Sequence, residues 1–168
     1  MRASRAVDVV RDENRSLIRP FGYVEDYPVV RRIGEYDLFL GNRLAADPSH
    51  HDREFAFVLT LAGDAEPLTT HHCPLVDGPG NDWSAFETAV DTARRLFRRD
   101  GSLLVHCTAG VSRSSTVLAT TLAAEERTSL AAGFDTVLDA RPSAVSHPAL
   151  RELAVVYLAA RAESPSRG

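Results

Sequence analysis

The sequence contains no lysine, only two cysteines and no long apolar run. All 19 basic residues are arginines, so no amine side chain is available for Schiff-base chemistry. Two cysteines in 168 residues do not make a disulfide scaffold, and charged residues interrupt the N-terminus where a signal peptide would have an apolar core. No stretch approaches the roughly 18 apolar residues of a membrane-spanning helix. We therefore expect a cytoplasmic protein with no membrane partner.

The formal charge of −4 gives the chain no overall basic field, so we expect no nucleic-acid partner and only local binding of anions. A hydrophobic content of 44% is enough for one packed core. We expect one domain over residues 33–163, an N-terminal extension over 1–32 and a short tail over 164–168. The extension is charge-dense and contains Pro20 and Pro28, which suits either a packed segment or a partly mobile arm. The sequence does not indicate an oligomeric state.

Strand-type and helix-type patterns alternate along the chain. The first predicted helix begins at Ser84, in a capping box with Glu87, and is closed by Gly101. This alternation predicts a single α/β domain, with a mainly parallel central sheet of four to five strands flanked by helices on both faces. Ligands then bind at the carboxyl ends of the strands. The predicted strands cover residues 37–40, 54–61, 71–76 and 103–105, a loop or short helix covers 42–53, and the later helices cover 111–126, 129–140 and 148–161.

The segment from His106 to Ser114 joins the last predicted strand to a helix. A short loop that enters a helix can turn its backbone N–H groups inward, and these donors together with the helix dipole bind an anion such as phosphate. Cys107 stands at the start of this loop, where the same field favours thiolate over thiol and makes it a nucleophile at neutral pH. The expected phosphate-binding loop comprises Thr108, Ala109, Gly110, Val111, Ser112 and Arg113.

Other residues of this segment suit the same chemistry. The planar guanidinium of Arg113 can bind two phosphoryl oxygens, which lysine could not do with the same geometry. Gly110 permits a close approach of the backbone, and the Ser114 hydroxyl can stabilise Cys107 as a thiolate and as a leaving group. We expect His106 to orient the loop. The alternative is that Cys107 is a small buried core residue, as free cysteines often are.

The segment from His106 to Ser114 resembles the active-site loop of the dual-specificity branch of the protein tyrosine phosphatases, whose pattern is His-Cys-x-x-Gly-x-x-Arg-Ser. All fixed positions match, and the resemblance extends from about Ile33 to about Tyr157. It implies the cysteine-phosphatase fold and a two-step reaction through a phosphocysteine, with no metal or organic cofactor. The implied partner is a phosphorylated protein, with phosphotyrosine as substrate and phosphoserine or phosphothreonine as further candidates.

The family also uses an aspartic acid that protonates the leaving group and then activates water. We assign this role to Asp77, because it follows a predicted strand, lies in a glycine-rich loop and precedes Trp83 at the family's usual spacing. Asp82 stands next to the predicted capping position, and Asp64 lies in the exit loop of the second strand, so both have structural explanations.

The chain also departs from its relatives in ways that bear on substrate. It lacks the Trp-Pro-Asp loop of the larger tyrosine-specific enzymes, and its cysteine loop lacks the extra basic residues of the inositol-lipid branch. Ser146, His147 and Pro148 stand where many relatives have an asparagine-containing turn. Three alternatives remain open: phosphatase action on a nucleotide, RNA 5′-phosphate, sugar phosphate or phospholipid; phosphoprotein binding without turnover; and another cysteine chemistry, such as sulfur transfer or arsenate reduction.

Three further groups of residues have simpler explanations. His71, His72 and Cys73 are ligand types, but neighbouring strand residues point to opposite faces, so we expect no metal site. Cys73 is a candidate to pair with Cys107 under oxidation. The arginines at 94, 95, 98 and 99 suit a solvated helix end better than a substrate-binding patch, since acidic residues share that helix.

Overall fold

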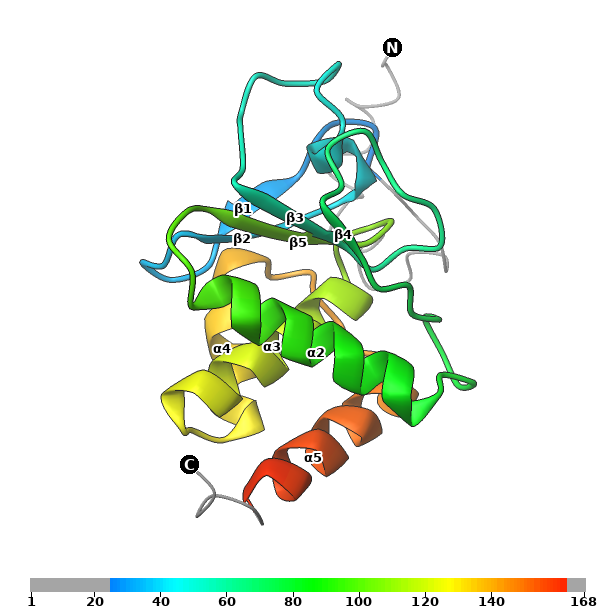
Figure 1. Cartoon of the computed structure of the whole chain (residues 1–168), viewed down its shortest axis with the longest axis vertical. Coiled ribbons are helices and arrows are strands. Elements are labelled where there is room, and N and C mark those ends of the chain that lie inside the picture. The colour runs from blue at the N-terminus through cyan, green and yellow to red at the C-terminus, as the bar shows by residue number, and fades with distance from the viewer. Residues whose placement is uncertain (1–24, 163–168) are drawn as a thin grey trace, which may run out of the picture.

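The computed structural model of the protein describes residues 25–162. In this part of the chain a five-stranded sheet packs against a layer of four α-helices (Figure 1). None of the described helices is long and apolar enough to cross a membrane. The strands are β1 (Val30–Arg32), β2 (Leu38–Gly41), β3 (Phe57–Thr60), β4 (His71–His72) and β5 (Leu103–His106). The helices are the 3-10 helix η1 (Arg43–Ala46) and the α-helices α2 (Trp83–Phe97), α3 (Arg113–Glu126), α4 (Leu130–Ala140) and α5 (Pro148–Ala162).

The sheet order is β1-β2-β5-β3-β4, with β5 in the centre. Strands β2, β5, β3 and β4 are parallel, and β1 pairs with β2 in the antiparallel direction. All residues of β2 and β5 are buried, as expected for parallel strands that are covered on both faces. The mainly parallel α/β sheet predicted from the sequence is confirmed. Because β5 is central, the loop that follows it emerges between the carboxyl ends of β2 and β3.

The helices are distributed unequally over the two faces of the sheet. All four α-helices lie on one face, where the larger hydrophobic core forms (Figure 1). Among the described residues the other face carries η1 and loop segments, which cover a small apolar cluster. That cluster consists of Phe39, Ala45, Ala46, Val58 and Leu104, with Val30, Phe55 and Leu68 packed against it.

Several element boundaries differ from the sequence prediction. Helix α2 begins at Trp83 behind Asp82, so the predicted capping box at Ser84 does not form. Strand β4 ends at His72, although the backbone N–H groups of Cys73 and Leu75 still donate to the carbonyls of Thr60 and Leu61 at the end of β3. The helix predicted over 129–140 begins one residue later, at Leu130, and Ser129 caps it, with its hydroxyl accepting a hydrogen bond from the backbone N–H of Ala132.

Strand β1 falls within the segment that the sequence assigned to the N-terminal extension. Its three residues show no apolar alternation that would have predicted a strand. Just before it, Val29 and Glu25 are buried, so residues 25–32 pack onto the domain. The rest of the expected extension, residues 1–24, and the expected tail at 164–168 lie outside the described residues.

Candidate active site

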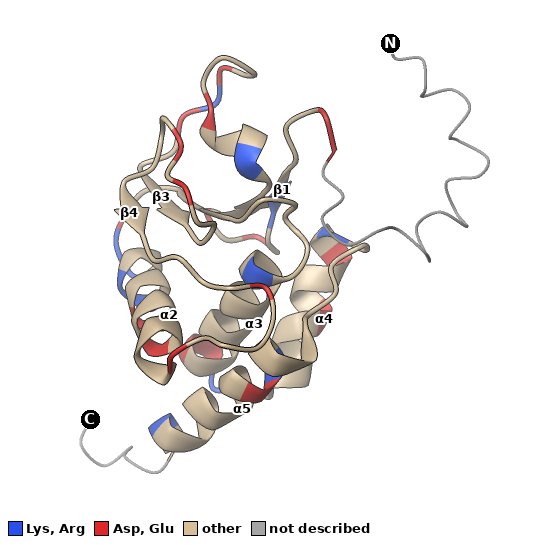
Figure 2. Cartoon of the chain, turned by 90° about the vertical axis from the view of Figure 1, so that its right-hand side faces the viewer, with Lys and Arg blue, Asp and Glu red and all other residues tan. Residues whose placement is uncertain are grey.

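The nucleophile candidate lies where the central strand ends. Cys107 directly follows β5, and the loop from 107 to 112 leads into α3, which begins at Arg113. The loop that joins β4 to α2 crosses in front of the N-terminal end of α3 (Figure 2). The Cys107 side chain is buried, and its Sγ lies 3.3 Å from the Oγ of Ser114 on the first turn of α3. A thiolate at this position would accept a hydrogen bond from that hydroxyl and face the positive end of the helix dipole.

The backbone carbonyls of the loop all point away from the anion site. Every carbonyl from Thr108 to Ser112 accepts a hydrogen bond from a group outside the cradle. In the described part of the chain, no backbone N–H of these same residues donates to another group. Since buried N–H groups need acceptors, this arrangement offers a row of donors to an anion. The outside donors are the N–H of Arg43, the guanidinium of Arg141, the N–H of Val145, the N–H and hydroxyl of Thr116, and the hydroxyl of Ser115.

Gly110 is the residue that lets the loop take this shape. Its φ of +70° lies in the left-handed region, and a Cβ there would come within 2.9 Å of the carbonyl oxygen of Gly41. The backbone N–H of Arg43 donates to Thr108 on the same side, at 3.1 Å. The β2–η1 connection therefore forms the wall against which the phosphate loop is folded.

Arg113 connects the phosphate loop to the loop that carries the acid candidate. Its Nη1 donates to the carbonyl of Leu75 and its Nη2 to the hydroxyl of Thr108, each at 3.2 Å. The Nε of Arg113 is buried and has no partner. Asp77 lies two residues beyond Leu75, and its Oδ1 is likewise buried without a partner. Two complementary polar groups, one on the helix that follows the phosphate loop and one on the acid loop, are thus left unsatisfied among the described residues.

The acid loop is closed on itself by Asn81, a residue that sequence reasoning missed. The Asn81 side chain accepts from the N–H of Val76 at 2.8 Å and donates to the carbonyls of Val76 and Gly78. Asp77 lies inside this turn, whereas the competing Asp82 is exposed and starts α2. An asparagine four residues after an aspartate is too common a pattern to have identified the clamp in advance.

His106 lies beneath the loop and is fully buried. Burial lowers the pKa of His106 from its usual 6.5 to about 4, although its hydrogen bond to the Cys107 carbonyl acts in the opposite direction. Its Nδ1–H donates to that carbonyl, so its Nε2 accepts from the hydroxyl of Thr60, 2.6 Å away. The ring is therefore neutral near pH 7 and is held by two partners, which agrees with the orienting role expected for it.

A second brace reaches the loop from behind. The Arg141 guanidinium donates from Nε to the carbonyl of Gly110 at 3.0 Å and from Nη2 to that of Ala109 at 3.1 Å. The same Nη2 forms a buried ion pair with Glu25 at 3.2 Å. An Arg-Pro pair after a helix was visible in the sequence, but its partner stands 116 positions earlier and could not be found by pattern.

The turn at 145–147 takes the place of the asparagine-containing turn that many relatives have. The backbone N–H of His147 donates to the hydroxyl of Ser112 at 3.0 Å, and the hydroxyls of Ser146 and Thr116 lie 2.7 Å apart. A Cβ built on Gly78 would lie 3.7 Å from the Nε2 of His147. This turn therefore contacts both the phosphate loop and the acid loop.

The other predicted groups have partners outside the phosphate loop. His72 bonds to the carbonyl of Ala62, His71 lies beside Thr70, and Cys73 lies 3.8 Å from the hydroxyl of Thr92. Among the described residues no cluster of three or more histidine, cysteine or acidic side chains could hold a metal ion. Cys73 and Cys107 are both free thiols.

The arginines of α2 serve the fold. Arg94 and Arg98 both form ion pairs with Glu125, and Arg99 stacks over the ring of Phe57. These contacts agree with the helix-end interpretation and not with a substrate-binding patch.

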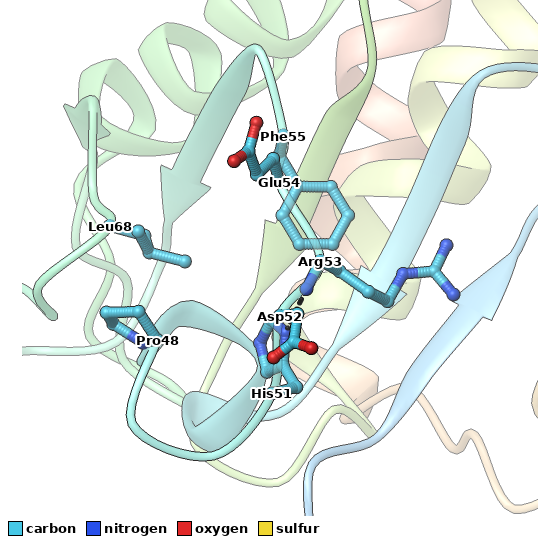
Figure 3. Close-up of a pocket in the computed structure, with 7 residues that line it drawn as sticks. All are labelled: Pro48, His51, Asp52, Arg53, Glu54, Phe55 and Leu68. Carbon is cyan, nitrogen blue, oxygen red and sulfur yellow. Dashed lines mark hydrogen bonds between the residues drawn. The ribbon is translucent and has the colours of Figure 1, made fainter.

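A shallow hollow lies on the face of the sheet that carries η1 (Figure 3). His51 fills part of it, with its Nε2–H donating to the carbonyl of Ala45 and its Nδ1 accepting from the N–H of Arg53. The Arg53 guanidinium lies over the rings of Phe39 and Phe55. These contacts hold the loop around the hollow in place. Its lining residues are Pro48, His51, Asp52, Arg53, Glu54, Phe55 and Leu68.

Comparisons with known proteins agree on one family. Residues 51–126 match the family model described as a polymorphic toxin system, DSP-PTPase phosphatase. Mouse dual specificity protein phosphatase 19 is 29% identical over 150 residues, covering 81% of this chain and 66% of that protein. Vaccinia virus dual specificity protein phosphatase OPG106 is 32% identical over 101 residues, covering 56% of this chain and 59% of that protein. The chain thus spans less than two thirds of these relatives' lengths.

Solved structures extend the likeness over the whole catalytic fold. The crystal structure of human DUSP28 matches with a TM-score of 0.68 and 26% identity, covering 81% of this chain and 100% of that one. A mouse putative dual specificity phosphatase complexed with zinc tungstate matches with a TM-score of 0.67 and 25% identity, covering 86% and 97%. These matches, together with the cysteine loop, confirm the resemblance seen in the sequence. The chain belongs to the dual-specificity branch of the cysteine-based protein tyrosine phosphatase family.

Proposed function

We propose that this protein is a protein phosphatase that hydrolyses phosphotyrosine, and phosphoserine or phosphothreonine in addition, through a phosphocysteine intermediate. One observation carries the proposal. A buried thiol, Cys107, opens a loop whose carbonyls from Thr108 to Ser112 all accept hydrogen bonds from outside the cradle, and Arg113 joins this loop to the acid loop at Leu75. The Nε of Arg113 and the Oδ1 of Asp77 are buried and have no partner among the described residues. The phosphoryl oxygens of an ester bound in this loop would accept hydrogen bonds from the backbone N–H groups and from Arg113. The leaving oxygen of the ester would accept a proton from Asp77.

The first step transfers the phosphoryl group to sulfur. The Cys107 thiolate attacks phosphorus, a sulfur–phosphorus bond forms, and the bond to the leaving oxygen breaks. Asp77 gives its proton to that oxygen, so a neutral alcohol or phenol departs. The donors of the loop and the Arg113 guanidinium stabilise the charge on the phosphoryl oxygens, which is greatest in the transition state.

The second step returns the enzyme to its starting state. Asp77, now a carboxylate, takes a proton from water as the water oxygen attacks phosphorus. The sulfur–phosphorus bond breaks, inorganic phosphate leaves, and Cys107 departs as a thiolate that the Ser114 hydroxyl stabilises. Every proton and electron pair is accounted for by the residues at the site, so the reaction as proposed needs no metal or organic cofactor.

The remaining assignments follow from this mechanism. We assign catalysis to the domain at 33–163, with a phosphorylated protein as its substrate. A nucleophilic thiol must stay reduced, and both cysteines are free, which supports action in the cytoplasm.

The experiment measures hydrolysis of an aryl phosphate, a phosphotyrosine peptide and a phosphothreonine peptide, with a metal chelator present. Wild type is compared with Cys107→Ser, which should retain phosphate binding and lose turnover. Turnover of both peptides by wild type alone would support a dual-specificity protein phosphatase. Turnover in Cys107→Ser would refute the mechanism. If the aryl phosphate is hydrolysed and neither peptide is, the substrate would instead be a non-protein phosphate ester.

A further inference from the structure

Four parts of the chain hold the carbonyls of the phosphate loop: the β2–η1 connection, the first turn of α3, the turn at 145–147 and the side chain of Arg141. The β2–η1 connection and the turn at 145–147 use backbone N–H groups, which any residue but proline supplies. Arg141 instead uses its guanidinium and binds the two middle carbonyls, those of Ala109 and Gly110. These belong to the part of the loop that contains the left-handed residue. The conformation of the cradle's centre therefore depends on one side chain.

That side chain depends in turn on Glu25. The exposed fractions of the two side chains are 5% for Arg141 and 7% for Glu25, so neither charge is solvated by water. A buried guanidinium without a counter-charge is costly, and the two Glu25 oxygens, each 3.2 Å from Nη2, supply that counter-charge. The Nη2 of Arg141 donates both to the Glu25 carboxylate and to the Ala109 carbonyl. The position of the carboxylate therefore determines how the Arg141 guanidinium is oriented towards the loop carbonyls.

The charge of the pair is close to zero, which decides how it can act. A lone guanidinium behind the loop would raise the local potential and attract phosphate directly. With Glu25 in contact, the two charges largely cancel at the distance of the anion site. The pair must act through geometry, by keeping the carbonyls turned away and the N–H groups turned towards the ligand.

We propose that Glu25 and Arg141 form a positioning pair that keeps the phosphate cradle in its binding conformation. This inference deepens the proposed function, on which it rests. The pair also links the segment before β1 to the reaction centre, so the stretch ahead of the sheet contributes to phosphate binding as well as to the fold. In this role both side chains act on the loop from behind and are not assigned contact with the substrate.

The test measures two quantities in the full-length chain: the dissociation constant of inorganic phosphate by calorimetry, and kcat and KM for an aryl phosphate. The variants are Arg141→Met, Arg141→Lys and Glu25→Gln, each studied below its own unfolding transition. We expect Arg141→Met to weaken phosphate binding by at least about 10-fold, because it releases two carbonyls from their donors. Arg141→Lys should recover part of the affinity, since an ammonium keeps the charge but loses the fork.

Arg94→Met is the matched control, because it removes an arginine from a part-buried ion pair with Glu125 far from the loop. It should lower stability without changing the phosphate dissociation constant. In a double-mutant cycle, Glu25→Gln should add little to Arg141→Met, because both break the same unit.

The proposal is overturned if folded Arg141→Met binds phosphate within twofold of wild type, or if Arg94→Met weakens binding equally. Should Arg141→Met not fold, the milder Arg141→Lys and Glu25→Gln decide by the same criterion. Phosphate binding needs no turnover, so its loss in these variants supports the pair even if no ester is hydrolysed. Unchanged binding with normal hydrolysis would reject the pair and leave the proposed function intact.

Discussion

Two groups of charged side chains in this molecule differ in how their polar atoms are satisfied. Where α2, α3 and α5 meet, Arg94 and Arg98 share Glu125, and Arg161 pairs with Asp91. At the carboxyl end of the sheet, the Nε of Arg113 and the Oδ1 of Asp77 are buried and have no partner. An unsatisfied buried polar atom costs about 1–3 kcal/mol, which a fold selected only for stability would avoid. The first group stabilises the helices, and the second is arranged for a ligand.

The comparison is most strongly tested by Arg113→Lys. Lysine keeps the positive charge but cannot hold two phosphoryl oxygens and the Leu75 carbonyl in one plane. We expect kcat/KM for an aryl phosphate to fall by about 10³-fold with little change in the free energy of unfolding. Steady-state kinetics and urea denaturation provide the two measurements. A loss of less than about 10-fold would show that the unpartnered Nε is not reserved for phosphate.

Asp77→Asn should have the next largest effect, and only on some substrates. A poor leaving group needs the proton and should be hydrolysed about 10²-fold more slowly, whereas an activated aryl phosphate should be affected much less. Kinetics on a series of aryl phosphates of increasing leaving-group basicity measure this difference. Asp82→Asn is the control and should behave as wild type. Equal slowing across the series would move the acid role away from Asp77.

A pH-dependent stability measurement on His106 tests the group of charged residues at the site, because His106 is buried beneath the phosphate loop and has hydrogen-bond partners for both ring nitrogens. Its pKa of about 4 lies below the usual 6.5, so between these values the unfolded chain binds the proton and the folded chain does not. Stability from the neutral ring is present above pH 6.5 and is lost as the pH falls. The stability difference between wild type and His106→Gln should shrink by about 2 kcal/mol from pH 7 to pH 5. A constant difference in urea denaturation would contradict the lowered pKa.

Tyr157→Phe removes one hydrogen-bonding partner from the other group of charged side chains, the one where α2, α3 and α5 meet. The Tyr157 hydroxyl donates to Asp91 and accepts from Arg94, and burial together with Asp91 raises its pKa. Its loss should cost about 1–2 kcal/mol of unfolding free energy and leave kcat/KM unchanged. Thermal or urea denaturation beside kinetics separates the two. If the folded Tyr157→Phe variant has a lower kcat/KM, the ion pairs between the helices and the candidate site are coupled.

The smallest effect is expected at Thr121, whose unpartnered hydroxyl has no proposed role in binding phosphate. Among the described residues, the Thr121 hydroxyl on α3 is the third buried side-chain polar atom without a partner. Thr121→Val replaces it with a methyl group of similar shape and should be neutral or stabilise by up to about 1 kcal/mol. Phosphate affinity should not change. Destabilisation in urea would reveal a partner for this hydroxyl.

The sequence predicted the parts of the site that are close together along the chain. Cys107, Gly110, Arg113 and Ser114 lie within one loop and helix turn, so their types and spacing were enough to predict the cradle. The parallel strands were also predicted, because they are short apolar runs separated by helices. The family-based prediction is confirmed, while the roles of the individual residues stay predictions.

The parts that sequence reasoning missed depend on contacts between distant positions. Glu25 and Arg141 meet only in the folded chain, and β1 is recognised by its pairing with β2 and not by its own residues. The capping box at Ser84 was wrong because Trp83 already continues the helix from Asp82. Such features follow from packing, which local propensity does not record.

The connectivity of the sheet also determines when the site forms during folding. The phosphate loop lies between β2 and β3, whose pairing with β5 brings together residues far apart in sequence, such as Leu38 with Leu103. The contact between Glu25 and Arg141 spans 116 positions and needs helix α4 to be complete. Long-range parallel pairing is slow, because the loop-closure entropy precedes the contacts that offset it. We therefore predict that the candidate site is among the last parts of the chain to assemble, so that recovery of turnover marks the end of refolding.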